Sequence, residues 1–209
     1  MCWNAETSLT SFILGSIINT IVMFYFKDNK DVLTICVIWQ FILLIQASEY
    51  LIWIDQDCKD TNKIGTKAAM VLTIMQPIFV YIVLMNTTKQ AQYLKIISSI
   101  IILIYICYMF VKVNETSEYT CTQPSQNCAH LNFKWWRDFE LGGPLYLISL
   151  FSILILLATW NKLNIFVIIY IALSLLFSSI FYSCGTPSMW CFFAVPFPIF
   201  LGLVAHYLI

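Results

Sequence analysis

The chain has few charged residues and very little histidine. Only 11% of its 209 residues are Asp, Glu, Lys or Arg, against about a quarter in an average soluble domain, and there are two histidines. The 11 basic residues are balanced by 11 acidic ones, which leaves no basic surface for a nucleic acid. With 60% hydrophobic residues and a mean hydropathy of +0.82, we expect the chain to lie in a lipid bilayer.

Catalytic and cofactor motifs are also missing. The sequence has no HExxH motif, no Gly-rich phosphate loop and no Ser/His/Asp set. The two histidines, His130 and His206, are too far apart for an intramembrane metal centre, and no lysine lies deep in an apolar segment, as a retinal Schiff base requires. We therefore expect no catalytic residues, no metal and no cofactor, and the balance favours a protein that is not an enzyme.

Seven apolar segments are long enough to cross a bilayer as helices, which takes about 20 residues each. The predicted spans are residues 9–26, 32–54, 68–85, 95–111, 144–160, 163–182 and 189–209. Residues 112–143 form a long loop between the fourth and fifth spans. We predict an all-α fold, a single polytopic transmembrane bundle of seven helices.

Loop charges and cysteines indicate which end of this bundle faces outside. The short loops after the first and third spans carry Lys27, Lys30 and Lys89, and positively charged short loops stay in the cytoplasm. We therefore predict an outside N-terminus and a cytoplasmic C-terminus. Six of the eight cysteines then lie at the outer end, as an oxidising compartment favours. This possible disulfide or thiol cluster consists of Cys2, Cys58, Cys121, Cys128, Cys184 and Cys191, with the pairing left open.

The long outer loop carries an amphipathic segment. Apolar and aromatic residues alternate with charged ones between residues 131 and 139, which is typical of a helix that lies at the membrane surface. We therefore predict an interfacial helix within residues 112–143. Its apolar and aromatic residues are Leu131, Phe133, Trp135, Trp136 and Phe139.

One acidic residue lies inside a predicted span. Glu49 belongs to the second span, about 6 Å below Trp53 at the outer boundary. An ionised carboxylate there costs roughly 2.5–3.5 kcal/mol on insertion scales, so such residues face the protein interior and indicate function. Trp39, Ile42 and Gln46 share one helical face with it. The alternative is structural, with Glu49 hydrogen-bonding neighbouring helices together.

Further polar residues are predicted near this level. Counting from the outer ends of the predicted spans puts Gln46 and Gln76 at about 12 Å depth, where their side chains can pair. Deeper polar residues, such as Asn19 and Gln40, are scattered and form no matching layer. We predict a pocket that opens to the outside above an apolar floor. Its predicted residues are Glu49, Gln46, Gln76, Trp53, Ser178 and Trp190.

Prolines interrupt the third and seventh predicted spans. Pro77, Pro196 and Pro198 each remove a helical N–H and free backbone carbonyls, which then need other partners inside a membrane. Broken helices line binding sites in transporters, although kinks without function are at least as common.

Three short motifs resemble an uncharacterised family of multi-pass membrane proteins of bacteria and large DNA viruses. The first is Met1-Cys2-Trp3-Asn4-Ala5 and the second Gln46-x-x-Glu49-x-x-x-Trp53; the third is Trp190-Cys191-Phe192-Phe193-Ala194. The chain departs from the family pattern in having Asn4 for Ser and Tyr50 for Gly. The resemblance implies a membrane bundle and names no reaction. With the predicted topology, it places Cys2 near Cys184 or Cys191, beside Glu49.

Three functions follow in order of preference. The first is binding of a small solute, an ion or a proton in the pocket around Glu49, for transport or sensing. The second is a structural or interaction role in a cellular or viral membrane, and the third is a membrane enzyme that uses Cys2 or Glu49. In each case we expect an integral multi-pass protein of a plasma, host-cell or virion membrane whose main partner is the lipid bilayer.

Overall fold

Seven helices and one two-stranded sheet make up the part of the chain that the structure describes. The structure is a computed structural model and describes residues 4–115, 121–125, 128–133, 141–158, 161–181 and 193–208. Its helices are α1 (Ala5–Tyr25), α2 (Lys30–Trp53), α3 (Asp60–Thr87), α4 (Gln92–Glu115), α6 (Gly142–Leu157), α7 (Lys162–Phe181) and α9 (Phe197–Leu208). The strands are β1 (Gln123–Ser125) and β2 (Cys128–Asn132).

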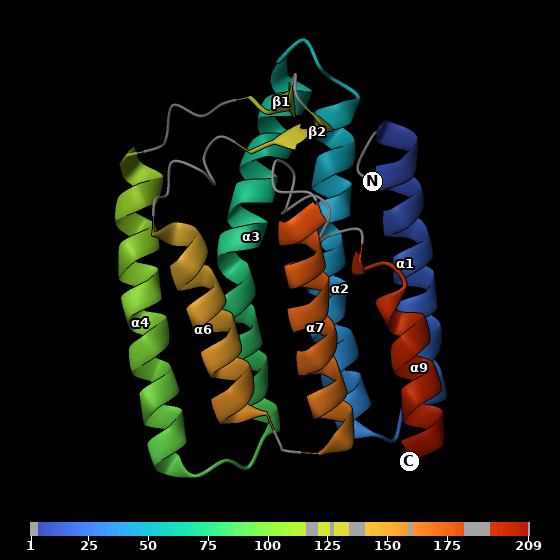
Figure 1. The fold of residues 1–209 in the computed structure, drawn as a ribbon, viewed down its shortest axis with the longest axis vertical. Coiled ribbons are helices and arrows are strands. Elements are labelled where there is room, and N and C mark those ends of the chain that lie inside the picture. The colour runs from blue at the N-terminus through green and yellow to red at the C-terminus, as the bar shows by residue number, and fades with distance from the viewer. Residues whose placement is uncertain are drawn as a thin grey trace.

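The helices run side by side in alternating directions (Figure 1). The N-terminus and the two strands lie at one end, which we call the hairpin end, and the C-terminus lies at the other end, which we call the base. α1 packs on α2, α2 on α3, and both α3 and α4 on α6, while α9 contacts α1, α2 and α7. The prediction of an all-α fold is confirmed.

Four of the helices are long and apolar enough to cross a membrane. α1 to α4 have 21, 24, 28 and 24 residues, hence lengths of about 31 to 42 Å, against about 30 Å for the hydrocarbon core of a bilayer. The other apolar helices, Gly142–Leu157, Lys162–Ser178 and Phe197–Leu208, are shorter.

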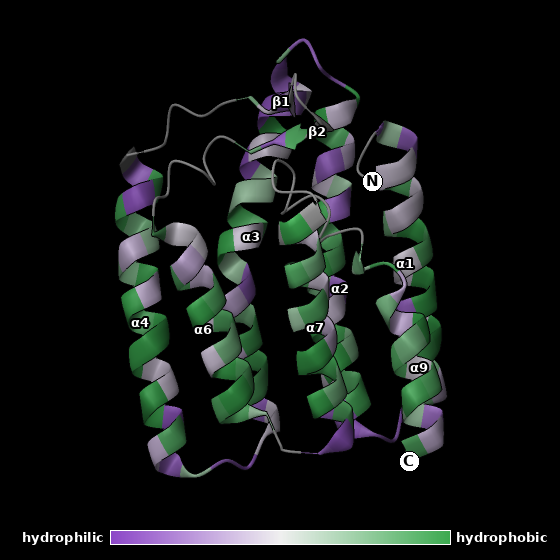
Figure 2. Ribbon diagram, viewed as in Figure 1, coloured by the Kyte–Doolittle hydropathy of each residue, from purple (hydrophilic) through white to green (hydrophobic). Residues whose placement is uncertain are grey.

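Apolar side chains cover the outward faces of the helices. Large side chains that are at least 60% exposed include Ile21, Phe24, Leu103, Phe110 and Leu173. Figure 2 shows hydrophilic residues gathered at both ends of the molecule, with a predominantly hydrophobic zone between them. Several polar side chains lie buried inside the bundle. This arrangement is the reverse of a soluble helical domain, in which the outward faces are polar.

α2 and α3 approach each other closely. A Cβ atom at Gly65 would lie 2.9 Å from the carbonyl oxygen of Ser48 and 3.0 Å from the backbone nitrogen of Ile52. Only glycine leaves room for these two backbones, as small residues do between membrane helices. Gly65 therefore sets the spacing and the register of α2 against α3.

α3 begins at Asp60, eight residues before the predicted span 68–85. Its first turns are polar, so they carry no hydropathy signal. The Asp55 carboxylate accepts a hydrogen bond from the backbone N–H of Asn62 at 3.0 Å and so satisfies one of the unpaired donors of the first turn. The helix consequently extends about 12 Å beyond the apolar segment.

Within the last predicted span, 189–209, α9 begins only at Phe197, after a turn at residues 194–196. The carbonyl oxygen of Pro196 accepts hydrogen bonds from Ile199 at 3.1 Å and from Phe200 at 3.3 Å, so Pro196 is the first helical acceptor. Pro198 lies in the first turn, where helices tolerate a missing N–H. α9 therefore has 12 residues, and the prolines interrupt this span.

The two strands lie in the loop for which an interfacial helix was predicted. Leu131 is buried in β2 and pairs with Pro124 of β1, so the helix prediction is wrong at this residue. Antiparallel pairing satisfies the local backbone in place of helical hydrogen bonds. Phe133 follows the strand and is also buried. Residues 134–140, with the remainder of the predicted helix, lie outside the described part.

Candidate functional site

The Glu49 side chain is 0% exposed and points into the bundle. Trp39, Ile42 and Gln46, on the same face of α2, are at most 4% exposed, and Trp53 is partly buried. The helical face that the 3–4 residue spacing identifies therefore lies against the other helices and away from the outer surface of the bundle.

The packing of α1 against α2 fixes an antiparallel register. Gly15 lies against the side chain of Leu43, where a Cβ atom would approach Leu43 Cδ2 to 2.8 Å. One turn nearer the base, Gln40 Nε2 donates a hydrogen bond to Ser16 Oγ at 2.9 Å. Each turn toward the start of α1 therefore matches a turn toward the end of α2.

This register places two serines of α1 beside the polar face of α2. Ser11, about one turn from Gly15, comes to the level of Gln46, and Ser8, about two turns from Gly15, comes to the level of Glu49. Both serines are buried. The hairpin half of the bundle thus contains a buried polar layer, which we define as Ser8, Ser11, Gln46, Ser48 and Glu49.

Ser178 and Trp190 were also predicted at this level. Ser178 of α7 is buried, and its hydroxyl donates a hydrogen bond to the carbonyl oxygen of Ser174 at 2.8 Å. This bond lies within α7 and joins no other helix. Trp190 lies outside the described residues, so its role stays a prediction.

Gln76 lies deeper in the bundle than Gln46. Since α3 starts eight residues before the predicted span, Gln76 is about 12 Å further from the hairpin end of its helix than the sequence suggested. The contact of Gly65 with Ile52 sets Gln76 opposite Trp39 of α2. The predicted common level of Gln46 and Gln76 is therefore wrong.

Gln76 instead meets Tyr146 of α6. The Tyr146 hydroxyl donates a hydrogen bond to Gln76 Oε1. The Gln76 residue is 1% exposed, and its Nε2 amide has no acceptor among the described residues. Tyr146 was not among the predicted site residues, although a tyrosine inside an apolar span carries a hydroxyl that needs a partner.

Gln76 and Tyr146 form the inner end of a cavity between α2, α3, α6 and α7. The cavity extends from there to the base, where it is lined by the partly exposed residues Asp31, Thr88 and Asn164. About 40 Å³ of its volume admits the centres of water-sized molecules. Of the predicted pocket residues that the structure describes, only Gln76 lines this cavity. Glu49, Gln46, Trp53 and Ser178 do not.

Trp39 forms part of the cavity wall and holds the broken segment before α9. Its indole Nε1 donates a hydrogen bond to the carbonyl oxygen of Ala194 at 2.6 Å, and its ring stacks on Phe197 with centroids 3.6 Å apart. In a continuous helix this carbonyl would accept from residue 198, but Pro198 has no N–H. The Tyr170 hydroxyl likewise donates to Phe193 O at 2.6 Å. The expected need for a replacement donor is confirmed at Pro198.

Asn19 and Gln40 form a second polar contact, between α1 and α2. Asn19 Nδ2 donates to the carbonyl oxygen of Cys36 at 2.9 Å and to Gln40 Oε1 at 3.1 Å. The expectation that these deeper residues are scattered is therefore wrong. The antiparallel register of α1 and α2 brings them to one level.

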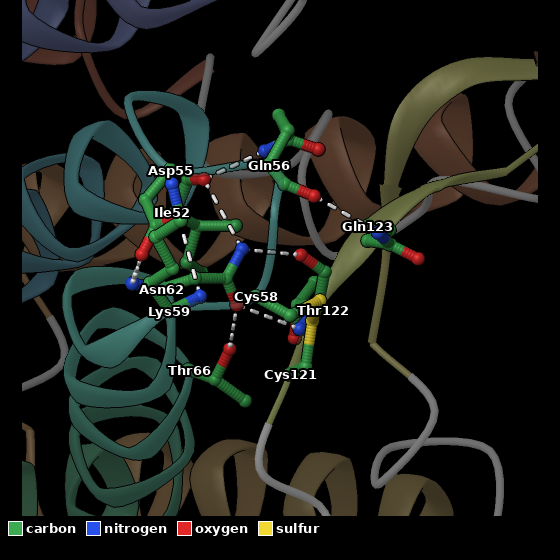
Figure 3. The surroundings of a disulfide bond; sticks show 10 residues. All are labelled: Ile52, Asp55, Gln56, Cys58, Lys59, Asn62, Thr66, Cys121, Thr122 and Gln123. Carbon is green, nitrogen blue, oxygen red and sulfur yellow. Dashed lines mark hydrogen bonds between the residues drawn. A yellow bond between two sulfur atoms is a disulfide. The ribbon is translucent and has the colours of Figure 1, made fainter.

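A cluster around Asn62 joins the start of α3 to the hairpin (Figure 3). Asn62 Oδ1 accepts from the Thr122 backbone N–H at 3.0 Å and from Thr66 Oγ1 at 3.1 Å. Asn62 Nδ2 donates to Thr122 O at 2.8 Å and to Ile52 O at 3.2 Å. This fully buried amide thus holds α2, α3 and the hairpin together.

Cys58 and Cys121 form a disulfide next to this cluster (Figure 3). Cys58 has φ 60°, an uncommon value for a residue other than glycine. The Asp55 carboxylate accepts from the backbone N–H groups of Asn62 and Lys59, at 3.0 and 3.2 Å. The first of these bonds is the main reason why the pKa of Asp55 lies below its ordinary value of 3.8.

Two of the six cysteines predicted to form an outer cluster are thus paired, and this part of the prediction is confirmed. Cys36 and Cys107 are free thiols within helices. Among the residues described, no group of three or more His, Cys, Asp or Glu residues is arranged to hold a metal ion. Outside the described part lie Cys2, Cys184, Cys191 and the side chain of Cys128, and their predicted proximity stays a prediction.

Comparison of the chain with protein-family models, with curated proteins and with solved structures gives no match.

Proposed function

We propose that this chain is a seven-helix integral membrane protein that binds a proton or a small cation at Glu49. The apolar outward faces of the helices support the membrane location, because so much exposed apolar surface is unfavourable in water. The hydrophilic zones at both ends, separated by a hydrophobic one, match the profile of a bilayer (Figure 2).

We further propose that the hairpin end faces outside. It carries the disulfide between Cys58 and Cys121, and disulfides persist in oxidising compartments. The short turns at the base carry Lys27, Lys30 and Lys89, which agrees with a cytoplasmic location. The N-terminus would then be outside and the C-terminus in the cytoplasm.

The observation that carries the binding proposal is the complete burial of Glu49 in a helix long and apolar enough to cross a membrane. A carboxyl group at such a position is costly to insert, and ionisable residues inside membrane bundles commonly bind ions or relay protons. The buried polar layer around it supplies hydroxyl and amide groups that suit a proton or a small cation.

Ion flux into liposomes that contain the purified protein tests this proposal. The variant Glu49→Gln keeps the shape of the side chain and removes its charge, while Glu49→Asp restores a carboxyl group. Glu6→Gln is the matched control, because Glu6 is an exposed acid in the first turn of α1. Proton entry is followed with an enclosed pH-sensitive dye, and Na⁺ and K⁺ entry with radioactive tracers.

We expect the flux through Glu49→Gln to be at least about tenfold lower than through the wild type. Glu49→Asp should retain part of the flux, and Glu6→Gln should match the wild type. A tenfold loss corresponds to about 1.4 kcal/mol. If Glu49→Gln folds and conducts like the wild type, Glu49 serves only to pack helices and the proposal fails.

A further inference from the structure

The cavity between α2, α3, α6 and α7 combines apolar walls with a hydrogen-bond donor at its inner end. We propose that it binds a small uncharged molecule that carries one carbonyl or ether oxygen on an otherwise apolar frame. This site is separate from the one proposed at Glu49, which does not line the cavity.

The inner end of the cavity provides a hydrogen-bond donor for a ligand. Gln76 is 1% exposed, and the Tyr146 hydroxyl already occupies its Oε1 atom. Gln76 lines the cavity, and its Nε2 amide has no acceptor among the described residues. Because a buried N–H without an acceptor is unfavourable, an oxygen atom brought by a ligand stabilises this position.

The walls of the cavity favour a ligand whose frame is apolar and uncharged. Apolar side chains from all four helices line the cavity between its two ends, among them Ile38, Val80, Leu150 and Val167. Asp31 is the one charged lining residue given by the structure, and its carboxylate at the base accepts a hydrogen bond from Asn161 Nδ2 at 2.6 Å. A charged ligand would lose its hydration without gaining an opposite charge at the inner end.

The dimensions limit the size of the ligand. A water molecule needs roughly 10–15 Å³ of such volume, so 40 Å³ holds about three waters. This is room for a compact organic molecule of a few non-hydrogen atoms. The partly exposed residues Thr88 and Asn164 place the entrance at the base.

Two isosteric probes separate an acceptor site from a nonspecific apolar crevice. Butanone has one carbonyl oxygen, and 2-methyl-1-butene has the same shape with a methylene group in its place. Saturation-transfer NMR on the protein in nanodiscs of deuterated lipid measures the binding of each. The variants are Gln76→Leu, which removes the donor, Val80→Phe, which fills the cavity, and Gln92→Leu as a control at an exposed position of α4.

We expect saturable butanone binding that Gln76→Leu weakens about three- to tenfold, the loss of one hydrogen bond. Binding of 2-methyl-1-butene should stay unchanged in Gln76→Leu, Val80→Phe should abolish binding of both probes, and Gln92→Leu should match the wild type. Equal saturable binding of the two probes to the wild type overturns the acceptor site, and this comparison holds even if Gln76→Leu does not fold. If neither probe gives a signal that Val80→Phe removes, the cavity holds water only and the proposal is overturned.

Discussion

The hydrogen bond from Trp39 to the carbonyl oxygen of Ala194 can be tested by a double-mutant cycle. Trp39→Phe keeps an aromatic ring against Phe197 but removes the indole N–H that donates at 2.6 Å. Leaving this buried carbonyl unsatisfied costs about 1–3 kcal/mol, and the smaller side chain adds a packing loss. We therefore expect Trp39→Phe to lower the free energy of unfolding by about 2–4 kcal/mol.

Pro198→Ala supplies the second arm of the cycle. The new backbone N–H of residue 198 can donate to Ala194 O, as in a continuous helix. In this background Trp39→Phe should cost about 1–3 kcal/mol less than in the wild type, because the carbonyl keeps a donor. The packing loss is the same in both backgrounds and cancels.

Denaturant titration in detergent micelles measures the free energy of unfolding of the wild type, the two single variants and the double variant. Trp53→Phe replaces Trp39→Phe in a control cycle, in which the effects of Trp53→Phe and Pro198→Ala on this free energy should be additive. If the cost of Trp39→Phe is the same in both backgrounds within about 0.5 kcal/mol, the proposed exchange of donors is refuted.

Three further predictions concern the hairpin half of the molecule. Gly65→Ala should be destabilising by about 1–3 kcal/mol, because the new methyl group meets the α2 backbone. Gly15→Ala should be near neutral, because its methyl group meets only the end of the Leu43 side chain. Denaturant titration measures the free energy of unfolding of both variants, and a larger loss in Gly15→Ala than in Gly65→Ala would contradict the packing. The pKa of Asp55 is lowered in the folded state, so its contribution to stability is complete above its ordinary value of 3.8 and disappears as the pH falls through the lower folded value. Melting temperatures should therefore fall more steeply below pH 3.8 in the wild type than in Asp55→Asn, and parallel profiles would refute this role. Cys58→Ser should lower the free energy of unfolding by at most about 4 kcal/mol, given the sequence separation of 63 residues. A reductant should lower the free energy of unfolding of the wild type by the same amount. If neither the variant nor the reductant changes this free energy, the disulfide does not constrain the unfolded chain.

The α2 face was predictable from the sequence because its pattern is local. Trp39, Ile42, Gln46 and Glu49 recur at helical spacing, and a helix enclosed by neighbours buries one such stripe whatever the neighbours are. The break before α9 was predictable for the same reason, since Pro198 removes its own N–H in any context.

The level of Gln76 was not predictable from hydropathy, because the first turns of α3 are helical and polar at once. Hydropathy shows where a segment becomes apolar and says nothing about where its helix begins. The hydrogen bond between Asn62 and Thr122 joins residues that are 60 positions apart in the sequence, and no local pattern indicates such a contact. The cavity at Tyr146 depends on how four helices pack, which sequence spacing does not reveal.

Infrared difference spectroscopy of the protein in lipid, recorded during a pH titration, tests the role of Glu49 most directly. It needs no knowledge of the ligand, because a protonated carboxyl group has its own carbonyl band. We predict a carbonyl band that appears and disappears reversibly with pH in the wild type. In Glu49→Gln this band is missing, while the bands of the other acidic residues remain. A wild-type spectrum without such a band, or the same band in Glu49→Gln, would contradict a titrating carboxyl group at the heart of the bundle.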